Sequence, residues 1–178
     1  MIKLNLGCST RRLPGYVNLD CQPAEAVDVV MDLKEIDKHY EEGTVDVIYI
    51  SHVLEHFPRH EARDLIKKLY TILKKGGVLR IAVPNFESVV IRYTLTLDLD
   101  ELHGLLYSNH DVPFDGHYTI WDFRTMSRDL KNVGFDEIKS YDWRMTDHST
   151  IDDYSQAYLP HMNKETGLLM SLNVEATK

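Results

Sequence analysis

The stretch KLNLGCSTRRLPGYVNLD, residues 3–20, constrains the fold most, because it combines a strand, a glycine-led loop and a second strand that ends in a carboxylate. The apolar run Ile2 to Leu6 ends at Gly7, where glycine allows a sharp turn and lets bare backbone approach a ligand. Tyr16 to Leu19 is a short strand, and Asp20 at its end can accept hydrogen bonds from both hydroxyls of a ribose. The stretch therefore has the outline of a nucleotide site. It equally suits an ordinary βαβ opening, in which Gly7 only turns the chain and Asp20 is a solvated strand end.

The loop after Gly7 departs from the dinucleotide-binding fingerprint in two ways. Gly7, Cys8 and Ser9 stand where G-x-G-x-x-G would begin, so the close approach of backbone to a pyrophosphate is not provided for. Gly7 and Asp20 are 13 positions apart (20 minus 7), against about 20 in the fingerprint, so the intervening helix must be truncated or absent. A mononucleoside fits this loop better than a dinucleotide does.

Composition limits the class of protein. A chain of 178 residues with 43% hydrophobic content predicts one domain over residues 1–178. The net charge of -8 disfavours nucleic acid as a partner, since a nucleic-acid surface must attract phosphates. Only two cysteines, Cys8 and Cys21, and no signal-peptide pattern at the start predict a cytoplasmic protein. No apolar run approaches the roughly 20 residues that a membrane span needs.

A third strand, Ala26 to Met31, ends at Asp32 and Leu33 much as the second ends at Asp20. Ligands of open α/β sheets collect at the carboxyl ends of the strands, so the two aspartates can face one nucleoside. Asp32 is also suited to be the N-cap of a helix over Lys34 to Glu41, and both roles can hold together.

The central part of the chain predicts a buried parallel strand over Val45 to Ile50, because this run is almost continuously apolar. The polar cluster SHVLEH follows it at residues 51–56. A helical apolar stripe covers Arg59 to Lys75, with Gly76 as the predicted helix stop, and Val78 to Val83 is the fifth strand.

The second half is less regular. Segment 86–121 is a predicted substrate-binding segment, because residues 108–121 are crowded with polar and aromatic residues. The polar, loop-like segment 144–167 is a second candidate, and a second subunit is the alternative source of the pocket. The remaining predicted elements are a helix over Asp122 to Val133 that ends at Gly134, and strands over Phe135 to Trp143 and Leu168 to Ala176.

Taken in order, the LNLGC loop, Asp20, the Asp32-Leu33 pair, DVIYISHVLEH, LKKGGVLRIAVPN and the closing SLNVEATK resemble a class I S-adenosylmethionine-dependent methyltransferase. More narrowly, the chain resembles a small bacterial group associated with surface-polysaccharide gene clusters. The resemblance implies an α/β, Rossmann-like sheet that is mostly parallel, with a truncated first helix and no N-terminal cap. It also implies that the last strand, Leu168 to Ala176, runs antiparallel beside Phe135 to Trp143.

The resemblance also implies a cofactor site for S-adenosylmethionine. Gly7 and its neighbours Leu6, Cys8 and Ser9 would face the methionine part, and Asp20 would hold the ribose. Asp32 and Leu33 would border the adenine, with Ser51 and His52 near the sulfonium. Three departures affect the methionine contacts: Asn5 stands where many relatives have an acidic residue, Ser9 stands where many have glycine, and the helix after Gly7 is short.

Methyl transfer from a sulfonium is an in-line displacement, so the protein chiefly has to align the acceptor. If the acceptor is a hydroxyl, a histidine within hydrogen-bond reach can take its proton. His52, directly after the fourth strand, and His117, with Tyr118 as an orienting neighbour, are the candidate catalytic residues. Each histidine also has an ordinary structural alternative, in which it bonds to its own loop or faces water. Glu55 and His56 recur in this class of enzyme whatever the substrate, which favours a structural role for them.

A metal site is not expected. His103, His110, Asp111 and Asp115 offer oxygen and nitrogen donors, but they have no recognised ligand spacing.

The function that these residues favour is O-methylation of a small polar acceptor: a sugar, a nucleotide-linked sugar or a phosphate-bearing glycan precursor. One alternative is a nucleotide-dependent oxidoreductase or epimerase, which the missing second and third glycines disfavour. Another is a non-catalytic, methyltransferase-like subunit that serves a partner. A homodimer is compatible with the short chain and its hydrophobic helices.

Overall fold

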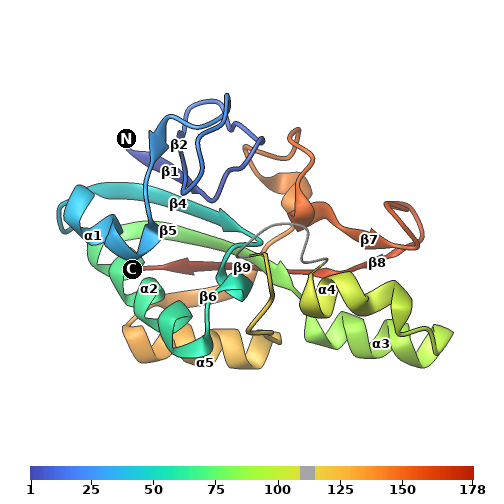
Figure 1. The fold of residues 1–178 in the computed structure, drawn as a ribbon. Coiled ribbons are helices and arrows are strands. Elements are labelled where there is room, and N and C mark those ends of the chain that lie inside the picture. Colours follow the sequence, from blue (N-terminus) through green and yellow to red (C-terminus); the bar gives the residue numbers. More distant parts are fainter. Residues whose placement is uncertain (109–114) are drawn as a thin grey trace.

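A computed structural model describes residues 1–108 and 115–178 of the chain. Its centre is a seven-stranded sheet with the strand order β3-β2-β1-β4-β5-β9-β6 (Figure 1). The first five strands in this order are parallel, and β9 runs antiparallel to both of its neighbours. The sheet strands are β1 (Lys3–Leu6), β2 (Val17–Asp20), β3 (Val29–Val30), β4 (Val45–Ser51), β5 (Leu73–Pro84), β6 (Asp136–Ser140) and β9 (Ser171–Thr177). The mostly parallel sheet with its inserted antiparallel last strand confirms the predicted fold class.

Helices cover one face of this sheet. Figure 1 shows α1, α2 and α5 on the same side of the strands, and their apolar residues share one core with the strands. The α-helices are α1 (Ile36–His39), α2 (Arg59–Ile72), α3 (Phe86–Thr96), α4 (His103–Tyr107) and α5 (Phe123–Val133). Single 3₁₀ turns are η1 (Leu33–Glu35), η2 (Leu54–His56), η3 (Asp100–Leu102), η4 (Trp143–Met145) and η5 (Tyr154–Gln156). No helix in the described part of the chain is both long and apolar enough to cross a membrane.

The other face of the sheet is covered by irregular chain. The strand period of two places Ile48 and Ile50 in the core beneath the helices, whereas Tyr49 points to the opposite face. There Tyr49 packs with Leu13 and Tyr16 of the loop between β1 and β2. The ring of His148 lies 4.0 Å from the ring of Tyr49, centroid to centroid. The loop after β1 and the segment that follows β6 therefore replace the helices that a doubly wound fold carries on this face (Figure 1).

The chain between β1 and β2 contains no helix, which confirms that the first helix is truncated, and one buried amide holds this loop in place. The Oδ1 atom of Asn18 accepts from the backbone N–H of Leu13 at 2.8 Å and from Nδ2 of Asn5 at 2.9 Å. The Nδ2 atom of Asn18 donates to the carbonyl of Tyr16 at 3.0 Å and to the carboxylate of Asp28 at 3.0 Å. Asn5, which departs from the family pattern, thus has a structural partner on the neighbouring strand.

Several predicted boundaries were wrong. The strand β3 covers only Val29–Val30 of the predicted Ala26 to Met31, and β6 ends at Ser140 instead of Trp143, which begins η4. Two further differences come from strand pairing. The second helix ends at Ile72 instead of Lys75, because Leu73 already pairs with Val45 as a strand residue and is fully buried. Gly76 therefore does not end a helix, although its φ of 77° does make a turn. The last strand is interrupted at Met170: Leu168–Leu169 forms a separate strand, β8, which pairs with β7 (Tyr158–Leu159). Tertiary pairing overrides the local apolar pattern at both places.

The helix predicted over Asp122 to Val133, with its end at Gly134, was confirmed as α5. Asp122 is the N-cap of α5, where it forms a capping box with Thr125. Gly134 ends α5 with a φ of 118°.

Candidate active site

The turn at Gly7 requires glycine. Its φ is 68°, and a Cβ atom at this position would lie 2.2 Å from Cγ2 of Val53. The backbone N–H groups of Gly7 and Cys8 both donate to the carbonyl of Leu19, at 2.8 and 3.0 Å. The glycine therefore permits β1 to turn tightly against the loop that follows β4.

Asp20 ties the glycine loop to the end of β2. Its Oδ2 atom accepts from the backbone N–H of Ser9 at 2.8 Å, and its Oδ1 atom accepts from the N–H of Gln22 at 2.9 Å. Asp20 is partly exposed, and each carboxylate oxygen can accept one further hydrogen bond. Asp32 caps η1, where its Oδ1 atom accepts from the N–H of Lys34 at 2.9 Å, which confirms the predicted capping role.

A hollow of about 310 Å³, counting the part open to solvent, lies at the carboxyl ends of β1 and β4. Of the predicted cofactor residues, Gly7, Cys8 and Ser51 line it. The other residues that line it are Asn5, Arg11, Leu13, Tyr49, Asp153 and Tyr154.

The remaining predicted cofactor residues lie beside this hollow or beneath it. Asp20 and Asp32 follow the next two strands of the sheet, outside the wall of the hollow. The side chains of Leu6 and Leu33 are buried in the core beneath the helices, so only their backbone atoms can face a ligand.

Arg11, Asp153 and Tyr154 line the hollow although no sequence motif indicated them. The guanidinium of Arg11 lies 4.6 Å from the centre of the Tyr154 ring, and its Nε atom donates to the carbonyl of Asp152 at 3.1 Å. Asp153 accepts from the hydroxyl of Tyr49 at 2.5 Å. These residues come from two loops that lie far apart in the sequence, and only the three-dimensional fold brings the loops together.

Cys8 is buried at the wall of the hollow and is not suited to act as a nucleophile. Burial raises the pKa of its thiol to about 11, and the negative charge of Asp20 adds to the effect. The thiol therefore stays protonated near neutral pH and serves as a small packing group.

His52 follows β4 directly and has a left-handed backbone, with φ of 53°. Its Nδ1 atom lies 3.0 Å from Oε1 of Glu55, and its Nε2 atom lies 3.2 Å from Oγ of Ser171. The ring of Tyr154, which lines the hollow, lies 5.5 Å from the ring of His52. His52 is thereby fixed next to the hollow by a carboxylate on one side and a hydroxyl on the other.

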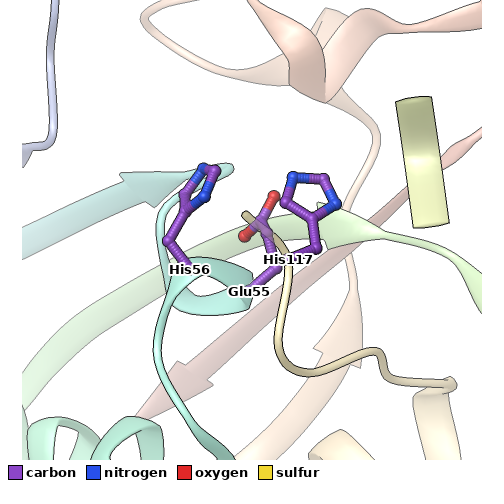
Figure 2. Close-up of side chains that lie close together, drawn as sticks. All are labelled: Glu55, His56 and His117. Atoms are coloured by element: carbon purple, nitrogen blue, oxygen red, sulfur yellow. The ribbon is translucent and has the colours of Figure 1, made fainter. Parts of the chain in front are cut away.

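Glu55 is fully buried between histidines. Figure 2 shows its carboxylate between the imidazole rings of His56 and His117. Burial alone would raise the pKa of Glu55, but its interactions with His52 and His56 outweigh this effect and lower the pKa. Burial lowers the pKa of His117, so this imidazole is neutral at pH 7. The two predicted catalytic histidines thus meet the same carboxylate.

Of the four possible oxygen and nitrogen donors in the sequence, His110 and Asp111 lie outside the described residues. Asp115 accepts a hydrogen bond from Oγ of Ser108 at 2.6 Å. The ring of His103 packs 5.3 Å from the ring of Tyr107.

Comparison with known proteins places this site in a family. A family model described as "Methyltransferase domain" matches residues 6–140, about three quarters of the chain. A search of curated proteins gives no match. Solved structures share the fold. A SAM-dependent methyltransferase from Archaeoglobus fulgidus is 16% identical, with a TM-score of 0.61 over 99% of this chain and 85% of that one.

Two further structures have the same fold at similar sequence distance. A Thermotoga maritima SAM-dependent methyltransferase, described as a possible histamine N-methyltransferase, is 13% identical, with a TM-score of 0.63 over 99% of this chain and 82% of that one. The trans-methyltransferase CalH, solved with S-adenosylhomocysteine, is 16% identical, with a TM-score of 0.55 over 99% of this chain and 51% of that one.

The sheet order, the antiparallel β9 and the family match together define a class I methyltransferase fold. The chain belongs to the methyltransferase-domain family and is an S-adenosylmethionine-dependent methyltransferase. Its cofactor is S-adenosylmethionine.

Proposed function

We propose that this enzyme transfers the methyl group of S-adenosylmethionine to a hydroxyl of a small polar acceptor. The observation that carries the proposal is the position of His52, directly after Ser51 at the wall of the hollow. The buried carboxylate of Glu55, 3.0 Å from Nδ1, orients the imidazole. His52 is the general base in this proposal.

In the proposed reaction, the acceptor oxygen attacks the methyl carbon in line with the carbon–sulfur bond. The O–CH₃ bond forms as the S–CH₃ bond breaks, and the bonding pair stays on sulfur to give S-adenosylhomocysteine. The hydroxyl proton passes to His52. The sulfonium is already an activated leaving group, so alignment of the acceptor supplies most of the rate enhancement.

The cofactor site that we propose spans the ends of β1, β2 and β3. Asp20 would accept hydrogen bonds from the ribose hydroxyls with the lone pairs left after its bonds to Ser9 and Gln22. Asp32 and the backbone of Leu33 would border the adenine. Arg11 is a suitable partner for the methionine carboxylate, because its guanidinium lines the hollow next to Gly7. Ser51 and His52 would then lie beside the sulfonium.

The proposed acceptor is a sugar, a nucleotide-linked sugar or a phosphorylated glycan precursor. This choice follows the resemblance to methyltransferases associated with polysaccharide clusters. The predicted substrate segments support it by their position. Segment 144–167 contributes Asp153 and Tyr154 to the wall of the hollow, and segment 86–121 contributes His117 beside Glu55.

Incubation with S-[methyl-³H]adenosylmethionine and a panel of sugars, nucleotide sugars and sugar phosphates tests the proposal. We expect label in an acid-stable, non-volatile product with at least one member of the panel. His52→Gln should lower kcat about 100-fold, with a much smaller effect on the dissociation constant for S-adenosylhomocysteine. His60→Gln, which changes an exposed histidine, is the matched control. Transfer of label only to amines, or an equal rate in His52→Gln, would contradict the proposal.

The homodimer and the cytoplasmic location predicted from the sequence stay predictions. Sedimentation velocity of the purified chain tests the first, and fractionation of the producing cell tests the second.

A further inference from the structure

The carboxylate of Glu55 is buried and makes no hydrogen bond among the described residues. Its side chain is fully buried, and neither oxygen has a hydrogen-bond partner within residues 1–108 and 115–178. His52 Nδ1 is within ion-pair distance of Oε1, but the angle is not that of a hydrogen bond. A buried carboxylate without such bonds costs folding free energy, and such groups persist where they bind a ligand or an ion.

Two histidines flank this carboxylate, and the Nδ1 atom of each is bonded to a backbone carbonyl. Nδ1 of His117 lies 3.0 Å from the carbonyl of Leu105, and Nδ1 of His56 lies 3.4 Å from the carbonyl of Gly116. A carbonyl only accepts, so each Nδ1 carries its proton there and each Nε2 keeps a free lone pair. Protonated Nδ1 bound to a carbonyl and unprotonated Nε2 is the usual arrangement of a metal-binding histidine.

The three side chains are held together by backbone hydrogen bonds as well as by packing. The N–H of Tyr118, next to His117, donates to the carbonyl of Glu55 at 2.8 Å. The hydroxyl of Thr119 donates to the carbonyl of Phe57 at 2.9 Å. The rings of His56 and His117 meet edge to face, with centroids 4.9 Å apart. The segment that carries His117 is therefore fastened along η2, and the cluster does not depend on a chance rotamer.

We propose that Glu55, His56 and His117 bind a first-row divalent metal ion such as Zn²⁺. One ligand atom from each side chain lies within 4.8 Å of the other two. Ligands about 2.1 Å from a tetrahedral zinc are about 3.4 Å apart, so the rings turn inward by about an ångström on binding. Two imidazoles and one carboxylate with an open fourth position form a donor set that suits zinc and its neighbours better than Mg²⁺.

The open position also gives the metal a role, which rests on the function proposed above. Oε1 of Glu55 lies 3.0 Å from Nδ1 of His52, so the proposed ion and the proposed base share one carboxylate. A bound metal lowers the pKa of a coordinated hydroxyl and orients it for attack. The acceptor class narrows accordingly to molecules that offer a hydroxyl next to a second oxygen donor, as sugars do.

This assignment departs from our expectation of no metal site. Glu55 and His56 are adjacent in sequence, and His117 follows 61 positions later (117 minus 56), so no ligand spacing is visible. Only the hydrogen bonds between η2 and residues 118–119 bring the third ligand to the other two.

Metal titration of the chelator-treated full chain tests the site, with Zn²⁺ by calorimetry and Co²⁺ by visible absorption. We expect one equivalent of each to bind, with Co²⁺ bands typical of four- or five-coordination, and Mg²⁺ to bind far more weakly. Glu55→Gln and His117→Gln should each weaken Zn²⁺ binding by about 100-fold. His60→Gln, at an exposed position beyond the cluster, should leave Zn²⁺ binding unchanged.

Circular dichroism identifies any variant that fails to fold. If the variants do not fold, the Co²⁺ spectrum of the unaltered chain is the test of the metal site. Absence of Zn²⁺ binding to the unaltered chain, or equal binding by the folded variants, would overturn the metal site. S-adenosylhomocysteine binding to the metal-free chain separates the two proposals: if it persists without metal binding, only the metal site fails. If metal binds but no acceptor hydroxyl is methylated, the proposed reaction fails and the site stands.

Discussion

Replacement of Gly7 by alanine tests the strained turn that opens the cofactor loop. The new Cβ would lie 2.2 Å from Cγ2 of Val53, and the φ of 68° disfavours any residue with a side chain. The left-handed backbone costs about 1–2 kcal/mol. Insertion of a methyl group into a packed contact costs about 1–3 kcal/mol more. We therefore expect Gly7→Ala to lose about 2–5 kcal/mol of unfolding free energy.

Gly15 provides the matched control, because its φ is 80° and nothing lies within 4 Å of an added Cβ. Gly15→Ala should lose only the free energy of placing alanine in a left-handed backbone, about 1–2 kcal/mol. The loss of chain entropy in the unfolded state is the same for both variants and cancels in the comparison. The difference between the two variants isolates the contact with Val53.

Urea denaturation of Gly7→Ala, Val53→Ala and the double variant completes the test. We expect the double variant to recover a coupling energy of about 1–3 kcal/mol, because the smaller residue removes the clash. Val53 adjoins His52, so Gly7→Ala should also slow methyl transfer, and Val53→Ala should restore part of the rate. If Gly7→Ala is no less stable than Gly15→Ala, the close approach of the two loops is wrong.

Three further predictions concern the irregular face of the sheet and the hollow. Asn18→Ala should lose about 2–4 kcal/mol in urea denaturation, because Leu13 N–H and two carbonyls lose their buried partner; a loss under about 0.5 kcal/mol would contradict the role of Asn18. Burial lowers the pKa of His148, so the unfolded chain takes up a proton first as pH falls. The free energy of unfolding should therefore decrease as pH falls from 7 towards 5. In thermal melts, His148→Phe, which keeps the ring contact with Tyr49, should make this decrease smaller. The same pH dependence of stability in the variant would refute this prediction. Arg11→Gln should weaken S-adenosylhomocysteine binding about tenfold in calorimetry if Arg11 pairs with the methionine carboxylate, and should leave it unchanged if it does not.

Much of the fold was predictable because local sequence patterns indicate most of its strands and helices. The apolar run at Val45–Ile50 indicates a buried strand, and the apolar stripe before Gly134 indicates a helix that ends there. Both signals are local in the sequence. The end of α2 was not predictable, because Leu73 joins the sheet only when Val45 is beside it. The same limit applies to Met170, whose N–H donates to the carbonyl of Ala157 at 2.8 Å.

The candidate site was predictable to the extent that it is built from strand ends. Gly7 and His52 directly follow β1 and β4, and Asp20 and Ser51 are the last residues of β2 and β4. Parallel strands bring their carboxyl ends to one edge of the sheet. The position of Tyr154 at the wall of the hollow could not be predicted. The long segment between β6 and β9 has no hydrophobic periodicity that indicates where it packs on the sheet. The grouping of His117 with Glu55 depends on backbone bonds between distant segments, which no spacing encodes.

A crystal structure of the chain with S-adenosylhomocysteine tests the central claim most directly, namely that successive strand ends bind one cofactor. We predict the ribose hydroxyls on the carboxylate of Asp20, the adenine beside Asp32, and the sulfur next to Ser51 and His52. A cofactor bound elsewhere on the molecule, or one that leaves Asp20 and the Gly7 turn without contacts, would contradict it.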